Sequence, residues 1–179
     1  MKMFTISGEM DHETVLAFTA FYATLTPEDI YPTIIIDSPG GNASAASAIL
    51  SIMEDSPYDW VTYCAGNAYS AALMVLAGGA FRSASVRSSM LYHDLWTIIA
   101  GSPDDIIKRA SADKHTTKQI FKLFAKATNK NATWWKKKAK EQGGDFFFNA
   151  DEAVEYGVID CIGFPIVQTK TQIGVMQAK

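Results

Sequence analysis

A serine stands where a strand pattern gives way to an apolar helix pattern. The segment from Gly66 to Ala72 stops one pattern and starts the other, with Ser70 at the junction. There, the unpaired backbone N–H groups of the first helical turn and the positive end of the helix dipole would stabilise a developing oxyanion. Capping is the common reason for a serine at a helix start, so Ser70 alone predicts only an N-cap.

A nucleophilic serine needs a general base, and histidine is the usual one because its pKa lies near neutral pH. The sequence has three histidines. His12 opens an amphipathic helix and His115 lies among lysines and threonines, so both are predicted to be solvated surface residues. His93 ends the apolar strand pattern that starts at Met90, which would hold its ring at the rim of a sheet. His93 is the candidate base, and a hydrogen-bonded core histidine is the alternative.

A carboxylate would orient such a base, and Asp94 and Asp145 are the candidates. Neighbouring residues on a strand point to opposite faces, so Asp94 cannot easily reach the ring of His93. Asp145 comes after a glycine break and directly before three phenylalanines. We therefore expect Asp145 to take this role.

Two consecutive glycines, Gly40 and Gly41, follow Ser38-Pro39 directly after a β-branched run. Glycines let a backbone approach another backbone or a ligand where a Cβ would collide. The N–H of Gly41 could face a substrate carbonyl, although a simple tight turn explains these four residues equally well.

The elements that must position these residues alternate between strands and helices. Runs of β-branched and apolar residues predict strands that are buried on both faces, which indicates an α/β architecture in a single domain. The predicted strands are 4–7, 33–37, 60–65, one that ends at 93, and 158–162. The first predicted helix starts after Asp11, and further helices are predicted at 43–53, 70–77 and 150–156. A charged helix from about 104 and a lysine-rich helical piece lie between the last two of these. A loose polar tail is expected after Pro165.

Composition excludes several classes of function. A net charge of −3 and a pI of about 5.6 argue against nucleic acid or an anionic membrane as the main partner. Apolar runs stay below the roughly 18 residues that a membrane helix needs, and a signal-peptide core is lacking, so we expect a cytoplasmic protein. Cys64 and Cys161 have apolar surroundings and are predicted to be buried thiols rather than a disulfide or a zinc site.

Four blocks in order resemble the proteolytic subunit of the Clp protease (ClpP), within the crotonase-like superfamily. They are Asp11-His12 at the start of the first helix, Ile36 to Gly41, Gly66 to Ala72, and Asp145 to Asp160, and His93 also falls in line. The resemblance covers Phe4 to about Gly163. It implies a ClpP/crotonase-like α/β fold of repeated strand-strand-helix units over residues 1–179, with a protruding handle at about 104–142 and a polar tail at about 165–179.

The resemblance also implies a function, a serine endopeptidase that hydrolyses peptides and unfolded proteins. Ser70, His93 and Asp145 take the triad roles, and the backbone N–H groups of Gly41 and Ala71 form the oxyanion hole. The family works as two stacked rings of seven subunits and receives chains from a ring-shaped unfoldase that consumes the ATP. Neither a metal nor a cofactor is expected in this chain, which has no phosphate-binding loop.

Two departures from the family pattern leave alternatives. Tyr69 stands where the family usually has a small residue, so we expect a different pocket shape; because the chain starts almost at the first core strand, we also expect it to lack the family's axial segment. One alternative is a crotonase-like enzyme that acts on CoA thioesters with a similar oxyanion hole. The other is a weakly active or inactive subunit that modifies a longer ClpP paralogue through mixed assembly.

Overall fold

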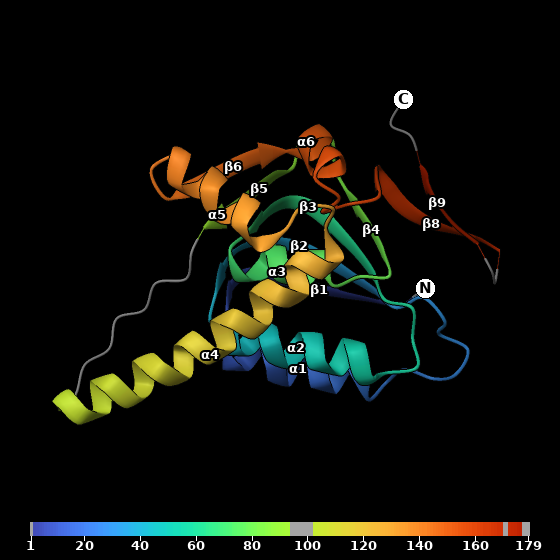
Figure 1. Cartoon of the computed structure of the whole chain (residues 1–179). Coiled ribbons are helices and arrows are strands. Elements are labelled where there is room, and N and C mark those ends of the chain that lie inside the picture. The colour runs from blue at the N-terminus through green and yellow to red at the C-terminus, as the bar shows by residue number, and fades with distance from the viewer. Residues whose placement is uncertain (1, 94–101, 170–171, 177–179) are drawn as a thin grey trace.

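The computed structural model describes residues 2–93, 102–169 and 172–176, and in them the chain forms an α/β fold (Figure 1). A seven-stranded sheet and a two-stranded hairpin make up the strands of this part. In chain order the elements are β1 (Met3–Met10), α1 (His12–Tyr22), β2 (Thr33–Gly41), α2 (Ala43–Asp55), β3 (Val61–Tyr69), α3 (Ala71–Ala77), β4 (Phe81–Ala84), β5 (Ser89–His93), α4 (Pro103–Ala127), α5 (Ala132–Glu141), β6 (Asp145–Asn149), α6 (Ala150–Glu155), β7 (Cys161–Ile162), β8 (Phe164–Thr169) and β9 (Gln172–Met176).

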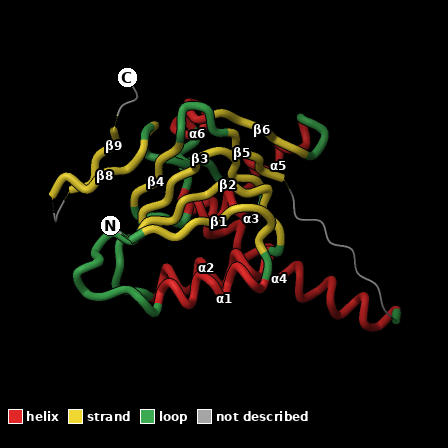
Figure 2. Tube along the Cα trace, turned by 180° about the vertical axis from the view of Figure 1, so that it is seen from behind, coloured by secondary structure: helices red, strands yellow, loops and turns green. Residues whose placement is uncertain are grey.

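The large sheet is mainly parallel, with the order β1-β2-β3-β4-β7. Strand β3 changes partner along its length, because residues 61–64 pair with β4 and residues 67–69 pair with β5. Strand β6 then pairs antiparallel with β5. Helices α1 and α2 lie side by side along one side of the sheet, below strands β1 and β2 in both views (Figures 1 and 2). The α/β expectation is confirmed.

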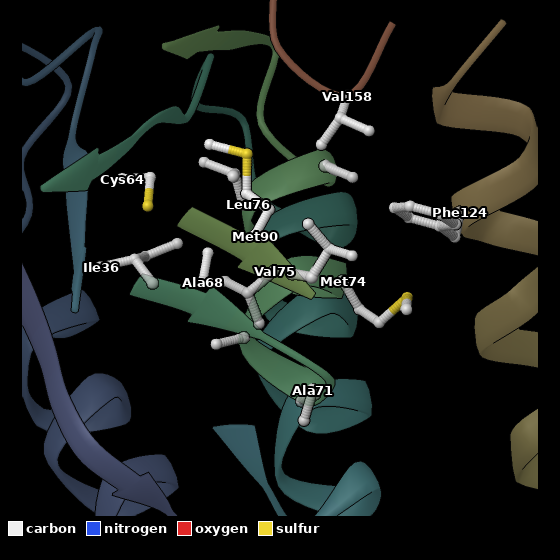
Figure 3. Packing of buried hydrophobic residues seen from close by; sticks show 14 of the residues in the cluster. Ile36, Cys64, Ala68, Ala71, Met74, Val75, Leu76, Met90, Phe124 and Val158 are labelled. Atoms are coloured by element: carbon white, nitrogen blue, oxygen red, sulfur yellow. The ribbon is translucent and has the colours of Figure 1, made fainter. Parts of the chain in front are cut away.

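The core lies between the sheet and the helices. Ile34 and Ile36 of β2 are fully buried, as the β-branched pattern predicts. All seven residues of α3 are buried, and Figure 3 shows Val75 and Leu76 among side chains from neighbouring strands, with Phe124 of α4 beyond. Helix α3 therefore has no solvent-facing side, which explains why its sequence is apolar throughout.

Helix ends follow local capping chemistry. Asp11 accepts a hydrogen bond from the backbone N–H of Thr14, and the Thr14 hydroxyl accepts one from the N–H of Asp11, so the predicted cap of α1 is confirmed. The charged helix and the lysine-rich piece are also confirmed, as α4 and α5. The first half of α4 projects away from the body of the molecule, and its residues 103–111 are all exposed (Figure 1).

Two strands run further than the sequence predicts. Strand β2 continues through Pro39 to Gly41, and β3 continues through Gly66 and Asn67 to Tyr69. The register explains the error: Ile36 pairs with Cys64 and Ser38 pairs with Ala68, so β3 uses two more residues than β2 over the same stretch. The glycines belong to an irregular piece of sheet and not to tight turns.

The C-terminal segment also differs from expectation. Instead of a loose tail, β8 and β9 form an antiparallel hairpin. Phe164 anchors its start, with its ring edge-on to Tyr63 of β3 at 5.0 Å between centroids. Residues 158–160 precede strand β7 and do not belong to it, although Val158 and Ile159 are buried. Both thiols were predicted to be buried: Cys64 is buried, whereas Cys161 is only partly buried.

Arg82 joins three elements around the end of α4. Its guanidinium forms an ion pair with Asp160 at 2.6 Å and donates hydrogen bonds to the carbonyl oxygens of Ala127 at 2.6 Å and Gly157 at 2.8 Å. Its side chain is only 14% exposed. Losing the guanidinium would leave a carboxylate and two carbonyl groups without this donor.

We therefore expect Arg82→Met to lower the free energy of unfolding by about 2 to 3 kcal/mol. Urea unfolding followed by tryptophan fluorescence measures this change. Arg87→Met, at an exposed position, is the matched control and should shift stability by less than about 0.5 kcal/mol. Equal effects of the two substitutions would contradict a structural role for the Arg82 contacts.

Candidate active site

Ser70 sits in strained backbone between β3 and α3. Its φ of 53° and ψ of −118° make it the only non-glycine residue with positive φ in the described part of the chain. Such a conformation costs about 1 to 3 kcal/mol and persists only where the surroundings impose it. The Ser70 side chain makes no capping hydrogen bond to α3, so the plain N-cap interpretation is wrong. What holds the residue is its backbone N–H, which donates to the carbonyl oxygen of Leu91 at 2.9 Å.

His93 and Asp145 lie opposite each other on antiparallel strands. His93 ends β5 and Asp145 begins β6, so they form the end pair of the ladder, and the His93 Nδ1 and Asp145 Oδ1 atoms are 3.8 Å apart. This distance permits an ion pair but exceeds hydrogen-bond length. The His93 side chain is 17% exposed and that of Asp145 is 61% exposed. His93 follows Leu91 by two residues, so Ser70 is tied to the strand that carries the histidine.

One of the two glycines at the end of β2 lies against the serine. A Cβ built on Gly40 would lie 2.4 Å from the carbonyl oxygen of Tyr69, 2.9 Å from the Cβ of Ser70 and 3.0 Å from the backbone nitrogen of Ala71. Gly40 has a φ of +91°, which favours glycine independently. Gly41 packs on β1 instead, since a Cβ there would meet the backbone of Met10 at 2.3 Å. The close approach to the serine is therefore made by Gly40.

Two polar side chains at the end of β2 fix this arrangement. Ser38 is buried, donates to the carbonyl oxygen of Gly8 at 2.6 Å and accepts from the N–H of Gly40 at 3.0 Å. The carboxylate of Asp37 accepts a hydrogen bond from the N–H of Asn67 at 2.9 Å. The end of β2 thus holds the irregular part of β3 that leads into Ser70.

Comparison with known proteins decides the family. The sequence profile of the family described as Clp protease matches residues 4–165. The chain belongs to the Clp protease family. Members of this family are serine peptidases, and the chain is an enzyme of that class.

Three relatives illustrate how much of the chain this similarity covers. The ATP-dependent Clp protease proteolytic subunit 2 of Corynebacterium efficiens is 30% identical over 165 residues, which cover 89% of this chain and 80% of that protein. Proteolytic subunit 1 of Borreliella burgdorferi is 30% identical over 167 residues, or 90% of this chain and 84% of that protein. Proteolytic subunit 2 of Bacillus licheniformis is 32% identical over 165 residues, which cover 90% of this chain and 85% of that protein.

Membership of the Clp protease family implies a ring-like oligomer that works with Clp ATPases, and chemistry that in general needs no cofactor.

Within the described ranges, no group of acidic, histidine or cysteine side chains could hold a metal ion. The same part of the chain contains no helix that is both long and apolar enough to cross a bilayer. A pocket of about 310 Å³ between α2, α3 and α4 is lined by none of the five candidate residues.

The structure describes the side chain of only one of the other two histidines, and it does not describe the alternative carboxylate. His12 is exposed at the start of α1, as expected. The His115 side chain and Asp94 lie outside the described residues, so both predictions about them stay predictions. Burial raises the pKa of the Cys64 thiol to about 12, which leaves it protonated and unreactive at neutral pH.

Sequence reasoning missed three residues that shape the site. The glycine pair was expected to allow a close backbone approach, but that role was given to Gly41, whereas Gly40 is the glycine that lies against Ser70. Leu91 carries the carbonyl that binds Ser70, and a backbone acceptor leaves no mark on residue type. Phe147 stands beside Tyr69, with ring centroids 5.7 Å apart. The odd-numbered residues of the 145–149 strand face outward, and recognising that strand would have exposed Phe147 as an outward aromatic.

Proposed function

We propose that this chain hydrolyses peptide bonds with Ser70 as the nucleophile, His93 as the general base and Asp145 as the group that orients the base. The observation that carries the proposal is the hydrogen bond from the Ser70 N–H to the carbonyl of Leu91. It ties the strained serine to β5, whose last residue, His93, is paired with Asp145. The order of these residues along the chain also fits the family.

The proposed reaction has two halves. The Ser70 hydroxyl attacks the substrate carbonyl while His93 accepts its proton, and the tetrahedral intermediate collapses as His93 returns that proton to the leaving amine. Water then attacks the acyl-enzyme, again with His93 as base, and releases the carboxylate product and free Ser70. The Asp145 carboxylate stabilises the imidazolium that forms in each half.

The oxyanion is proposed to bind the backbone N–H groups of Ala71 and Gly41. Ala71 is the first residue of α3, so its N–H points out of the helix N-terminus and the helix dipole supports negative charge there. Gly41 follows Gly40, whose contact with Ser70 brings the end of β2 against the nucleophile. Two amide donors from different elements would thus converge on the carbonyl that Ser70 attacks.

The wider assignment follows the family. We propose a single peptidase domain over residues 1–179. It assembles into two stacked rings of seven subunits, with α4 and α5 as the handle by which the rings meet. Unfolded proteins and peptides are the proposed substrates, and an ATP-dependent unfoldase of the Clp type or a longer ClpP paralogue is the proposed partner. ATP would be consumed by the unfoldase and not by this chain. We place the enzyme in the cytoplasm, of a bacterium or of a phage-infected host.

A CoA-thioester reaction is not favoured. That chemistry would use an oxyanion hole and acidic residues, but it gives no role to a histidine that faces a carboxylate next to a strained serine. The family match points to peptidases.

Asp145→Asn tests the proposed function without removing the nucleophile. An amide keeps the shape of the side chain but cannot stabilise an imidazolium, so we expect kcat for a fluorogenic peptide to fall by about 10² to 10³-fold. The expected loss is smaller than for a buried triad carboxylate, because Asp145 is 61% exposed. Asp151→Asn, an exposed aspartate in the first turn of α6, is the control. Unchanged kcat in Asp145→Asn would contradict the assignment.

A further inference from the structure

Charge is distributed unevenly along this chain. Residues 1–81 carry nine acidic residues and one lysine, whereas residues 118–140 carry eight lysines and no acidic residue. The basic segment covers the second half of α4, the loop after it and most of α5. The net charge of −3 is therefore an average over regions of opposite sign. It argues against a polyanion as the partner of the whole surface, but a local surface of one sign can still bind one.

Three lysines form a stripe along the second half of α4. Lys118, Lys122 and Lys126 are four residues apart and all exposed. Residues at this spacing lie one above the other on a helix, about 6 Å apart along its axis. Phe121 and Phe124 are buried and attach this half of α4 to the core, so the stripe faces outward. The half of α4 that would reach a second ring is the other one, which projects away from the body (Figure 1).

Lysines of α5 and of the loop before it extend the stripe. The Lys136 ammonium lies over the ring of Phe121 at 5.8 Å, which places it beside α4. Lys130 and Lys138 both lie over the ring of Trp134, at 5.4 and 5.8 Å from its centroid. Cation–π contacts hold an ammonium group on the surface and leave its charge in place. The basic surface therefore consists of Lys118, Lys122, Lys126, Lys130, Lys136 and Lys138.

The charges of the stripe are not neutralised within the chain. In the part of the chain that the structure describes, none of the three stripe lysines forms an ion pair, whereas Lys137 and Lys138 of α5 lie 3.8 and 3.6 Å from Glu141. Like charges four residues apart destabilise a helix. An anion with closely spaced charges would remove this repulsion and would also gain from the release of its counterions.

The composition of the basic surface fits a phosphate backbone better than a protein. Protein interfaces centre on buried apolar and aromatic side chains, with charges at the rim. The described residues of 118–140 include no large apolar side chain that is exposed. The lysine step of about 6 Å is close to two nucleotides of a stacked strand, which span about 7 Å. Glu54 lines the same pocket as Lys126, so negative charge borders the stripe and favours a thin single strand over a duplex.

We propose that the basic surface binds single-stranded nucleic acid through its phosphate groups. Lysine contacts phosphate as a point charge and reads no base, so the binding is expected to be independent of sequence and steeply dependent on salt. Each neutralised phosphate of a single strand contributes about −0.7 to the slope of the logarithm of the association constant against that of the salt concentration, so the stripe accounts for about −2. This inference is independent of the chemistry proposed for Ser70.

Fluorescence anisotropy of a labelled oligouridine strand, titrated with the assembled protein at several salt concentrations, measures both the affinity and this slope. We expect the combined substitutions Lys118→Gln, Lys122→Gln and Lys126→Gln to weaken binding at least about 10-fold at low salt and to reduce the slope by about 2. Arginine at the same three positions keeps the charge, so that variant should bind within about threefold of the native protein.

The matched control removes the same charge from exposed positions outside the basic surface. Arg87, Lys108 and Arg109 are exposed, and their combined replacement by glutamine should change the affinity less than about threefold. Equal losses in the two glutamine variants would overturn the proposal, because binding would then depend on overall charge alone. A native protein that does not bind the strand, or binds it without salt dependence, would overturn it as well. Tighter binding of a duplex, or equal competition by polyglutamate, would overturn the assignment of the ligand.

Discussion

Ser70→Ala is expected to abolish peptide hydrolysis, with a loss in kcat of about 10⁴-fold or more, while the protein stays folded. Removing the hydroxyl removes the atom that would form the acyl-enzyme. Alanine can occupy the same backbone conformation at similar strain, and the hydrogen bond from residue 70 to Leu91 uses the backbone. The free energy of unfolding should therefore change by less than about 0.5 kcal/mol.

Asn131→Ala provides the contrast for this substitution. The Asn131 side chain accepts a hydrogen bond from the N–H of Trp134 at 2.9 Å and so caps α5, whereas the Ser70 side chain caps nothing. Loss of the Asn131 cap should cost about 1 kcal/mol of stability and leave kcat near the native value. Parallel urea unfolding and peptide assays measure both quantities. If Ser70→Ala lost stability and kept its hydrolysis, Ser70 would be a structural residue.

Gly40→Ala is expected to cause the second largest effect on activity. The new methyl group would meet the Tyr69 carbonyl oxygen at 2.4 Å and the Ser70 Cβ at 2.9 Å. Neither backbone atoms nor a Cβ can swing away as a flexible side chain would, so β2 and the Ser70 junction must separate. A shift of about 1 Å at a nucleophile can cost about 10²-fold in rate, and we expect kcat to fall at least that far. The positive φ and the clash together should cost about 2 to 4 kcal/mol of stability.

Gly143→Ala is the matched control for Gly40→Ala. Gly143 has a φ of +77°, but a Cβ built there would have no atom within 4 Å. The control therefore carries the backbone penalty without the contact, and we expect a loss of about 1 kcal/mol with kcat unchanged. If the two variants hydrolysed peptide equally well, Gly40 would not be holding the serine in place.

The sequence was sufficient where one local rule dominated. The β-branched run at Ile34 to Ile36 predicts a strand buried on both faces, and capping chemistry at Asp11 fixes the start of a helix. His93 at the end of an apolar strand was predicted from the contrast between its neighbours and those of His12. Each of these predictions depends on residues close in the chain, so the tertiary fold had little opportunity to override them.

Tertiary contacts decided what the sequence did not predict. A Pro-Gly-Gly segment normally indicates a turn, but here β1 pairs with the end of β2 and keeps Gly40 and Gly41 in the sheet. The hydrogen bond that Ser70 makes in its strained conformation goes to Leu91 on another strand, so residue type alone could not reveal it. The hairpin of β8 and β9 was missed although its strands carry β-branched residues such as Val167, Ile173 and Val175, which favour strands.

The proposed role of Ser70 is tested most directly by labelling the native protein with a fluorophosphonate and locating the adduct by peptide mass spectrometry. We expect one adduct per chain, on Ser70, and a labelling rate that falls at least about 100-fold in His93→Gln, because that variant lacks the base that activates the hydroxyl. A native protein that stays unlabelled, or carries the adduct on another residue, would contradict the assignment of Ser70 as the nucleophile.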